Sequence, residues 1–108
     1  MTLRSRLIAT WQGGKTAAGG GHNYDAGKAS IESILAAEPR LREYAELDYE
    51  QFCNIGSQDM DETVWLGLAK RGNAVLAGNR YDAVIITHGT DTMEETAYFL
   101  NMTTHSTK

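Results

Sequence analysis

The feature that most constrains the fold is the uninterrupted apolar run at residues 83–86 (AVII). A continuous run rich in β-branched residues is typical of a parallel strand that is covered on both faces. A second apolar run at residues 7–10 (LIAT) ends in a glycine-rich segment at residues 13–21, as a buried strand leading into a loop would. Residues 47–55 alternate between two kinds of side chain, which predicts a third strand with mixed faces.

Three stretches between and after these strands have the spacing of helices. The first contains Ile31, Ile34 and Leu35, and Pro39 is expected to end it. The last begins after the strand predicted at residues 83–86, where Thr92 and Glu95 match a capping box.

The middle helix is the longest. Asp59 is its predicted N-cap, with Glu62 three residues later, and Gly78-Asn79 is its predicted end. Gly72 costs about 1 kcal/mol against alanine and marks a possible break. The apolar stripe consists of Val64, Trp65, Leu68, Val75 and Leu76. Strands that alternate with helices predict an α/β fold, a parallel sheet with flanking helices.

Composition narrows the class of protein. A chain of 108 residues with 42% hydrophobic and 22% charged residues fits one small globular domain. The net charge of −4 argues against a nucleic-acid partner, because phosphate binding needs a basic surface. The lone Cys53 cannot form an internal disulfide. Since no apolar run reaches the length of a membrane span or a signal peptide, we expect a cytoplasmic protein or a mature form whose export signal has been removed.

Small polar residues gather where the predicted strands end. The strand predicted at residues 7–10 leads to Thr16, the one at 47–55 to residues 56–59 (GSQD) and the one at 83–86 to residues 87–92 (THGTDT). In an open parallel sheet the carboxyl ends of the strands lie at one edge, which is where such sheets bind ligands. The topology alone therefore predicts a site at this edge.

The residue types at this edge suit acyl transfer. Two threonine hydroxyls near one carbonyl group can act once a base activates them, and the backbone N–H groups of Gly89 and Thr90 can stabilise an oxyanion. Asp91 suits a positively charged ammonium group, while Ser57 and Gln58 suit a carboxylate or an amide.

A purely structural interpretation competes for several of these residues. Asp91, Thr92 and Ser57 are also ordinary capping and turn residues, and a cap alone contributes about 1 kcal/mol. We expect His88 to be a turn residue with satisfied hydrogen bonds rather than a general base. Cys53 is expected to be a small buried residue.

A nucleotide-binding loop is the alternative function. Residues 9–16 (ATWQGGKT) nearly match a Walker A motif, with Ala9 in place of its first glycine. In such a loop the lysine and threonine begin a helix, whereas the three glycines at residues 19–21 oppose one here. The strand ending at Thr87 also leads to His88 rather than to an aspartate that binds magnesium.

Three segments resemble one known family. Residues 87–100 (THGTDTMEETAYFL) resemble the second signature of bacterial L-asparaginases, and residues 54–60 (NIGSQDM) resemble the substrate-binding loop of the exported type. Residues 64–70 (VWLGLAK) are similar to a helix of the same family. The resemblance implies hydrolysis of L-asparagine to L-aspartate and ammonia, with weaker action on L-glutamine. It implies neither a metal nor an organic cofactor.

The resemblance also assigns roles to individual residues. Thr16 matches the nucleophilic threonine and Tyr24 the loop tyrosine that helps to activate it, while Thr90 matches the second catalytic threonine. The residues that match those holding the α-carboxylate and α-ammonium groups of the substrate are Ser57, Gln58 and Asp91. The first signature is altered here, with extra residues around positions 11–12 and 15, and Thr10 is the less favoured candidate for the nucleophile. The glycines at residues 19–21 favour a mobile lid that brings Tyr24 to Thr16, against a plain surface linker.

Family members continue well past this length, with a catalytic lysine, a C-terminal domain and a neighbouring subunit that completes each site. The resemblance therefore implies that residues 1–108 are part of the N-terminal α/β domain of an L-asparaginase, without the C-terminal domain. We expect the chain alone to be inactive; the alternative is a non-catalytic fragment that binds a small ligand. The full-length family member implied is a homotetramer, periplasmic or secreted, without a nucleic-acid or membrane partner.

Overall fold

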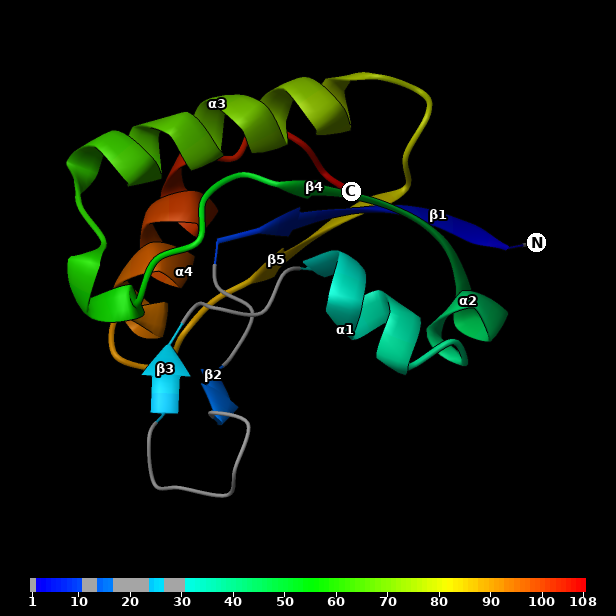
Figure 1. The fold of residues 1–108 in the computed structure, drawn as a ribbon. Helices are drawn as coiled ribbons and strands as arrows, with labels where there is room; N and C mark the ends of the chain where they lie inside the picture. Colours follow the sequence, from blue (N-terminus) through cyan, green and yellow to red (C-terminus); the bar gives the residue numbers. More distant parts are fainter. Residues whose placement is uncertain (1, 11–13, 17–23, 27–30) are drawn as a thin grey trace.

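The fold is a three-stranded parallel sheet with helices on both faces, and the computed structural model describes residues 2–10, 14–16, 24–26 and 31–108 (Figure 1). The strands β1 (Leu3–Ala9), β4 (Ala45–Gln51) and β5 (Ala83–Thr87) lie in the order β4-β1-β5. Both pairings are parallel, with Leu7 opposite Tyr49 on one side and Ile85 on the other. The predicted fold class is confirmed.

The central strand is β1, because it pairs with both other strands of this sheet. The prediction that residues 83–86 are covered on both faces is wrong for the described part of the chain. Its strand β5 lies at an edge of the sheet, and the Ile85 side chain is 46% exposed. An apolar pattern shows that a strand is built for burial, but it does not show which segments supply the cover.

Alternating side chains of β1 point to the two faces of the sheet. Leu7 and Ala9 pack with Ile31 and Leu35 of helix α1 (Ile31–Ala37) on one face. Ile8, fully buried, points to the other face, where helix α3 (Glu62–Ala77) lies on the opposite side of the sheet from α1 (Figure 1). The long helix α3 also packs against α4 (Met93–Thr103), and the rings of Trp65 and Phe99 stack with centroids 5.7 Å apart.

Helix α3 begins two residues later than the predicted cap would place it. Its N-cap is Asp61, whose carboxylate accepts a hydrogen bond of 3.0 Å from the Val64 amide. Asp59 lies instead in the 3₁₀ turn η1 (Ser57–Asp59), so its assignment as the cap was wrong. Aspartate favours the N-cap position at either residue, and the turn at η1 decides between them. Helix α3 runs through Gly72 without a break and has Gly78 as its C-cap.

The capping box predicted for α4 does not form. Thr92 is the N-cap residue, but its side chain makes no capping hydrogen bond. Its hydroxyl donates instead to the Ser57 carbonyl oxygen over 2.8 Å, because the loop containing Ser57 lies against this end of the helix. The strand predicted at residues 47–55 is β4 at 45–51, and the short helix α2 (Leu41–Tyr44) before it was not predicted.

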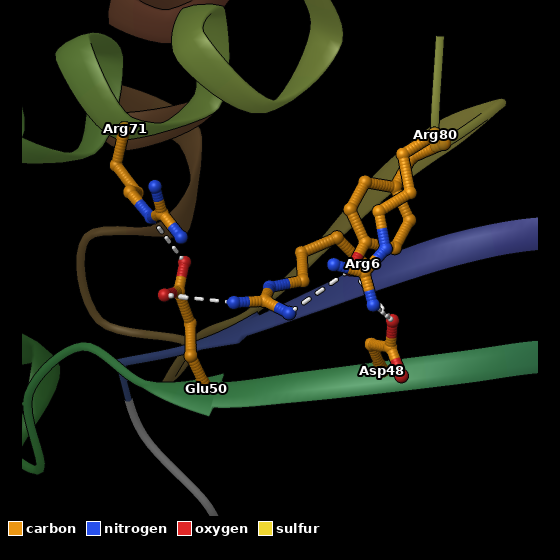
Figure 2. A network of polar contacts seen from close by, with 6 residues as sticks. Arg6, Asp48, Glu50, Arg71 and Arg80 are labelled. Carbon is orange, nitrogen blue, oxygen red and sulfur yellow. Dashed lines mark hydrogen bonds and ion pairs between the residues drawn. The ribbon is translucent and has the colours of Figure 1, made fainter. Parts of the chain in front are cut away.

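A network of charged groups spans the face of the sheet under α3 (Figure 2). Glu50 of β4 accepts hydrogen bonds from Arg71 of α3 over 2.7 Å and from Arg6 of β1 over 3.3 Å. The bond from Arg71, reinforced by the charges of both arginines, lowers the pKa of the Glu50 carboxyl group. The same network continues through the Tyr81 hydroxyl, which accepts from Arg6 and donates to Asp48. Three elements distant in sequence are joined in this way.

Two short strands, β2 (Gly14–Thr16) and β3 (Tyr24–Ala26), form an antiparallel pair with Thr16 opposite Tyr24. The predicted lid at residues 19–21 lies outside the described residues. Among the helices that the structure describes, none is long and apolar enough to cross a membrane.

Candidate active site

The carboxyl ends of the three parallel strands are tied together by Thr10, the residue that follows β1. Its buried hydroxyl donates to the Thr87 carbonyl oxygen at the end of β5 over 2.6 Å. Its own carbonyl oxygen accepts from the Ile55 amide, beyond the end of β4, over 3.1 Å. The predicted convergence of the strand ends is therefore present for β1, β4 and β5.

Ser57 joins the two polar loops that leave β4 and β5. Its side-chain oxygen accepts from the Asp91 amide over 3.0 Å, and its carbonyl oxygen accepts from the Thr92 hydroxyl. Ser57 is 4% exposed. Because its oxygen serves as the acceptor for Asp91, the serine proton is left to donate to a further group.

Gly89 permits this close approach of the two loops. A Cβ atom at position 89 would lie 2.7 Å from the Ser57 side-chain oxygen and 3.0 Å from the Ser57 Cβ. Gly89 is itself buried, so a larger residue there has to displace Ser57. The glycine is thus required by the packing of the two loops.

Beside these buried residues stand three exposed ones, Gln58, Thr90 and Asp91. Within the part of the chain that the structure describes, the hydroxyl of Thr90 and the carboxylate of Asp91 have no hydrogen-bonding partner. The edge therefore presents an amide, a hydroxyl and a carboxylate to a ligand, with the Ser57 hydroxyl beneath them. A ligand with both an ammonium and a carboxylate group matches these side chains chemically.

Of the six site residues predicted from the sequence, the structure brings four together. Ser57 and Asp91 are in direct contact, and Gln58 and Thr90 are their chain neighbours. Thr16 and Tyr24 are opposite each other in the backbone pairing of β2 and β3, while their side chains lie outside the described part.

His88 has the role expected of a turn residue. Its Nδ1 atom contacts the Gly89 carbonyl oxygen, and its Nε2 atom lies 2.7 Å from the Thr96 hydroxyl. Both ring nitrogens are therefore engaged, which leaves neither to act as a general base.

The geometry disagrees with the nucleotide-binding alternative. Lys15 and Thr16 lie in strand β2, whereas the corresponding residues of a P-loop begin a helix whose N-terminus binds the phosphates. In the described ranges, no group of three or more histidine, cysteine, aspartate or glutamate residues is arranged to hold a metal ion.

Two features of this edge were not predicted from the sequence. Thr10 was considered only as a minor candidate for the nucleophile, yet its hydroxyl is committed to the Thr87 carbonyl. Cys53 is half-buried rather than buried, and its thiol contacts the Thr10 carbonyl oxygen at 3.8 Å. Burial raises the pKa of the Cys53 thiol, which makes it a weak nucleophile. A threonine directly after a buried strand is the one local signal for such a tie.

Comparison with known proteins gives a consistent result. The family model for the N-terminal part of asparaginases matches residues 7–108. L-asparaginase 2 of Escherichia coli is 49% identical over 102 residues, which cover 90% of this chain and 28% of that protein. A probable periplasmic L-asparaginase of Haemophilus influenzae is 47% identical, again over 90% of this chain and 28% of that protein.

The fold comparison agrees. The crystal structure of a probable cytoplasmic L-asparaginase from Campylobacter jejuni superposes with a TM-score of 0.83 and 39% sequence identity. The match covers 92% of this chain and 31% of that one. The chain thus spans less than a third of the length of these similar proteins.

Proposed function

Since this chain belongs to the asparaginase family, we propose that it is the N-terminal part of an L-asparaginase subunit, which hydrolyses L-asparagine to L-aspartate and ammonia. The observation that supports this most is the contact between Ser57 and Asp91 at the shared edge of the strands. It joins the backbone of Asp91, a residue that is exposed, to a hydroxyl whose proton is free to be donated, next to the exposed Thr90. These groups complement an α-amino acid.

In the proposed complex, Asp91 pairs with the α-ammonium group of asparagine. The Ser57 hydroxyl and the Gln58 amide donate to its α-carboxylate. Charge-assisted hydrogen bonds of this kind are about twice as strong as neutral ones, and the two opposite charges on the α-carbon orient the substrate. The side-chain amide is thereby directed to the threonines. L-glutamine, longer by one methylene group, is the weaker substrate in this proposal.

The proposed chemistry is acyl transfer through threonine. The Thr16 oxygen forms a bond to the amide carbon while its proton passes, with the help of Tyr24, to the amide nitrogen, and the C–N bond breaks to release ammonia. Water then attacks the acyl ester, which returns the proton to the Thr16 oxygen and releases aspartate. Thr90 contacts the reacting group as the second threonine, and backbone N–H groups stabilise the oxyanion. No metal or organic cofactor enters this sequence.

The site proposed here is completed by parts of the subunit outside these 108 residues, and by a neighbouring subunit of a homotetramer. A lysine beside Thr90 is proposed to supply the missing proton transfers. The similarity of residues 54–60 to the exported type supports a periplasmic or secreted location, and nothing in this proposal involves a nucleic acid or a membrane.

A chimera tests the proposed function. Residues 1–108 replace the matching segment of Escherichia coli L-asparaginase 2, with 49% identity to preserve the contacts to the remainder. We expect the chimera to release ammonia from L-asparagine without added metal or nucleotide. A folded tetrameric chimera that leaves asparagine untouched, or that binds ATP tightly instead, would show that the proposed function is wrong.

A further inference from the structure

His88 takes part in a chain of side-chain hydrogen bonds that begins in the helical layer and ends in the loop of the candidate site. The indole N–H of Trp65, on α3, donates to the Thr96 hydroxyl oxygen, on α4, over 2.8 Å. The same oxygen lies 2.7 Å from His88 Nε2. The other ring nitrogen, Nδ1, contacts the Gly89 carbonyl oxygen. Thr96 is 3% exposed, so this chain runs through the interior.

The groups at the two ends fix the direction of the end bonds in this chain, because an indole N–H only donates and a carbonyl oxygen only accepts. A carbonyl oxygen only accepts, so Nδ1 of His88 carries a proton. The Trp65 indole only donates, so the Thr96 oxygen accepts from it and keeps one proton to give. Among the described residues, Nε2 of His88 is the acceptor in contact with that hydroxyl. With the Thr96 proton donated to Nε2, the ring carries its own proton on Nδ1.

This arrangement controls the peptide group between Gly89 and Thr90. The C=O and N–H bonds of a trans peptide point in opposite directions. A Gly89 carbonyl oxygen held against His88 therefore turns the N–H group of Thr90 away from His88. The other side of Gly89 is in contact with Ser57. The peptide is thus held between His88 and Ser57, directly before the two exposed residues Thr90 and Asp91.

We propose that His88 is a positioning residue, whose Nδ1–H tautomer, set by the Gly89 carbonyl oxygen and the Thr96 hydroxyl, orients the Gly89–Thr90 peptide and with it the Thr90 side chain. The effect of His88 on turnover rests on the proposed function, whereas the tautomer of His88 follows from its hydrogen bonds alone. The contribution is to the placement of the reacting group, so it affects kcat more than KM. The residues that bind the α-carboxylate and α-ammonium groups of the substrate, Ser57 and Asp91, stay joined by their own hydrogen bond.

Four variants of the chimera test the proposal. His88→Asn keeps a donor near the position of Nδ1, whereas His88→Gln moves its amide toward Thr96 and loses that donor. Losing one hydrogen bond of about 0.5–1.5 kcal/mol corresponds to about two- to tenfold. We expect that loss in kcat for His88→Gln, at unchanged KM, and near-normal kcat for His88→Asn. Thr96→Val removes the hydroxyl that fixes the tautomer and is expected to lower kcat as well. Trp65→Phe keeps a ring against Phe99 and leaves the threonine proton on its path to His88, so it is the matched control.

The tautomer is measured separately, by nitrogen NMR of the chimera labelled with ¹⁵N-histidine and assigned with His88→Asn. The expected His88 signals are a protonated Nδ1 and an unprotonated Nε2, changed in Thr96→Val and retained in Trp65→Phe. A proton on Nε2 in the parent protein would overturn the proposal. Equal kcat values for His88→Asn and His88→Gln would overturn it too. A parent chimera that is inactive but shows the expected tautomer would count against the proposed function while supporting the arrangement at His88.

Discussion

Replacing Gly89 by alanine perturbs the contact between the two loops of the candidate site directly. The added methyl group would lie 2.7 Å from the Ser57 side-chain oxygen and 3.0 Å from the Ser57 Cβ, both of which are too close for any unshifted contact. Ser57 cannot move without cost, because its oxygen accepts from the Asp91 amide and its carbonyl oxygen accepts from the Thr92 hydroxyl. The substitution therefore forces the loops apart where substrate is proposed to bind.

The magnitude follows from the cost of overpacking. Overpacking a tightly filled position by one methyl group costs about 1–3 kcal/mol. A cost in this range corresponds to a change of about 5- to 150-fold in an equilibrium constant. We expect the KM of the chimera for L-asparagine to rise by a factor in this range, because the displaced Ser57 and Asp91 are the proposed binding groups. The thermal midpoint of unfolding is expected to fall in parallel.

A matched control is available in helix α3. Gly72 has no atom within 4 Å of the position that a Cβ would occupy, so Gly72→Ala adds the same methyl group in open space. Alanine in a helix interior is favoured over glycine by about 1 kcal/mol, so this control is expected to be neutral or stabilising. If Gly89→Ala behaved like Gly72→Ala, with unchanged KM and midpoint, the proposed role of the contact between Gly89 and Ser57 would be refuted.

Three further predictions concern the site, the charged network and the isolated chain. In the chimera, Thr90→Val should lower kcat by about 10²-fold or more, since it removes a positioned reacting group and keeps the shape. Asp91→Ala should raise KM. A Thr90→Val enzyme with normal kcat and only lower stability would identify Thr90 as a turn residue. Because the pKa of Glu50 is lowered in the fold, its stabilising effect is complete above the ordinary pKa of about 4.3 and is lost as pH falls through the lowered value. Glu50→Gln should therefore destabilise the chimera at neutral pH by about 1 kcal/mol, with a difference in unfolding midpoint that narrows toward pH 3, and an undiminished difference would contradict the assigned cause. The 108-residue chain alone should release no ammonia from asparagine, because part of the proposed site lies outside it and, in the described residues, the edge strand β5 leaves Ile85 exposed. Turnover near that of a full-length relative, abolished by Thr90→Val, would disprove this.

The elements that the sequence predicted correctly are those specified by local patterns. The apolar runs at 7–10 and 83–86 became β1 and β5, and Pro39 and Gly78 follow the helices they were expected to end. The parallel arrangement followed from the alternation of strands and helices, and the common edge of Ser57 and Asp91 followed from that arrangement. Such features need only neighbouring residues to specify them.

The features that were missed depend on contacts between distant residues. Asp59, with Glu62 three residues later, is the better cap in sequence, yet the turn at Ser57–Asp59 leaves Asp61 as the cap. The tie from Thr10 to Thr87 joins positions 77 residues apart, and Glu50 meets Arg71 across 21 residues. No periodicity encodes these pairings, because they depend on which strand lies beside which and in what register.

Burial separates two kinds of residue at the candidate site that the sequence does not distinguish. Ser57 and Gly89 are buried and hold the loops together, while their chain neighbours Gln58 and Thr90 are exposed. This alternation has a physical reason, because a buried polar group must find its partner within the protein, whereas an exposed one is free to bind a ligand. A capping role and a binding role therefore need not compete for the same residue. Ser57 shows this most clearly, since its oxygen accepts from Asp91 within the fold and its proton is left for a ligand.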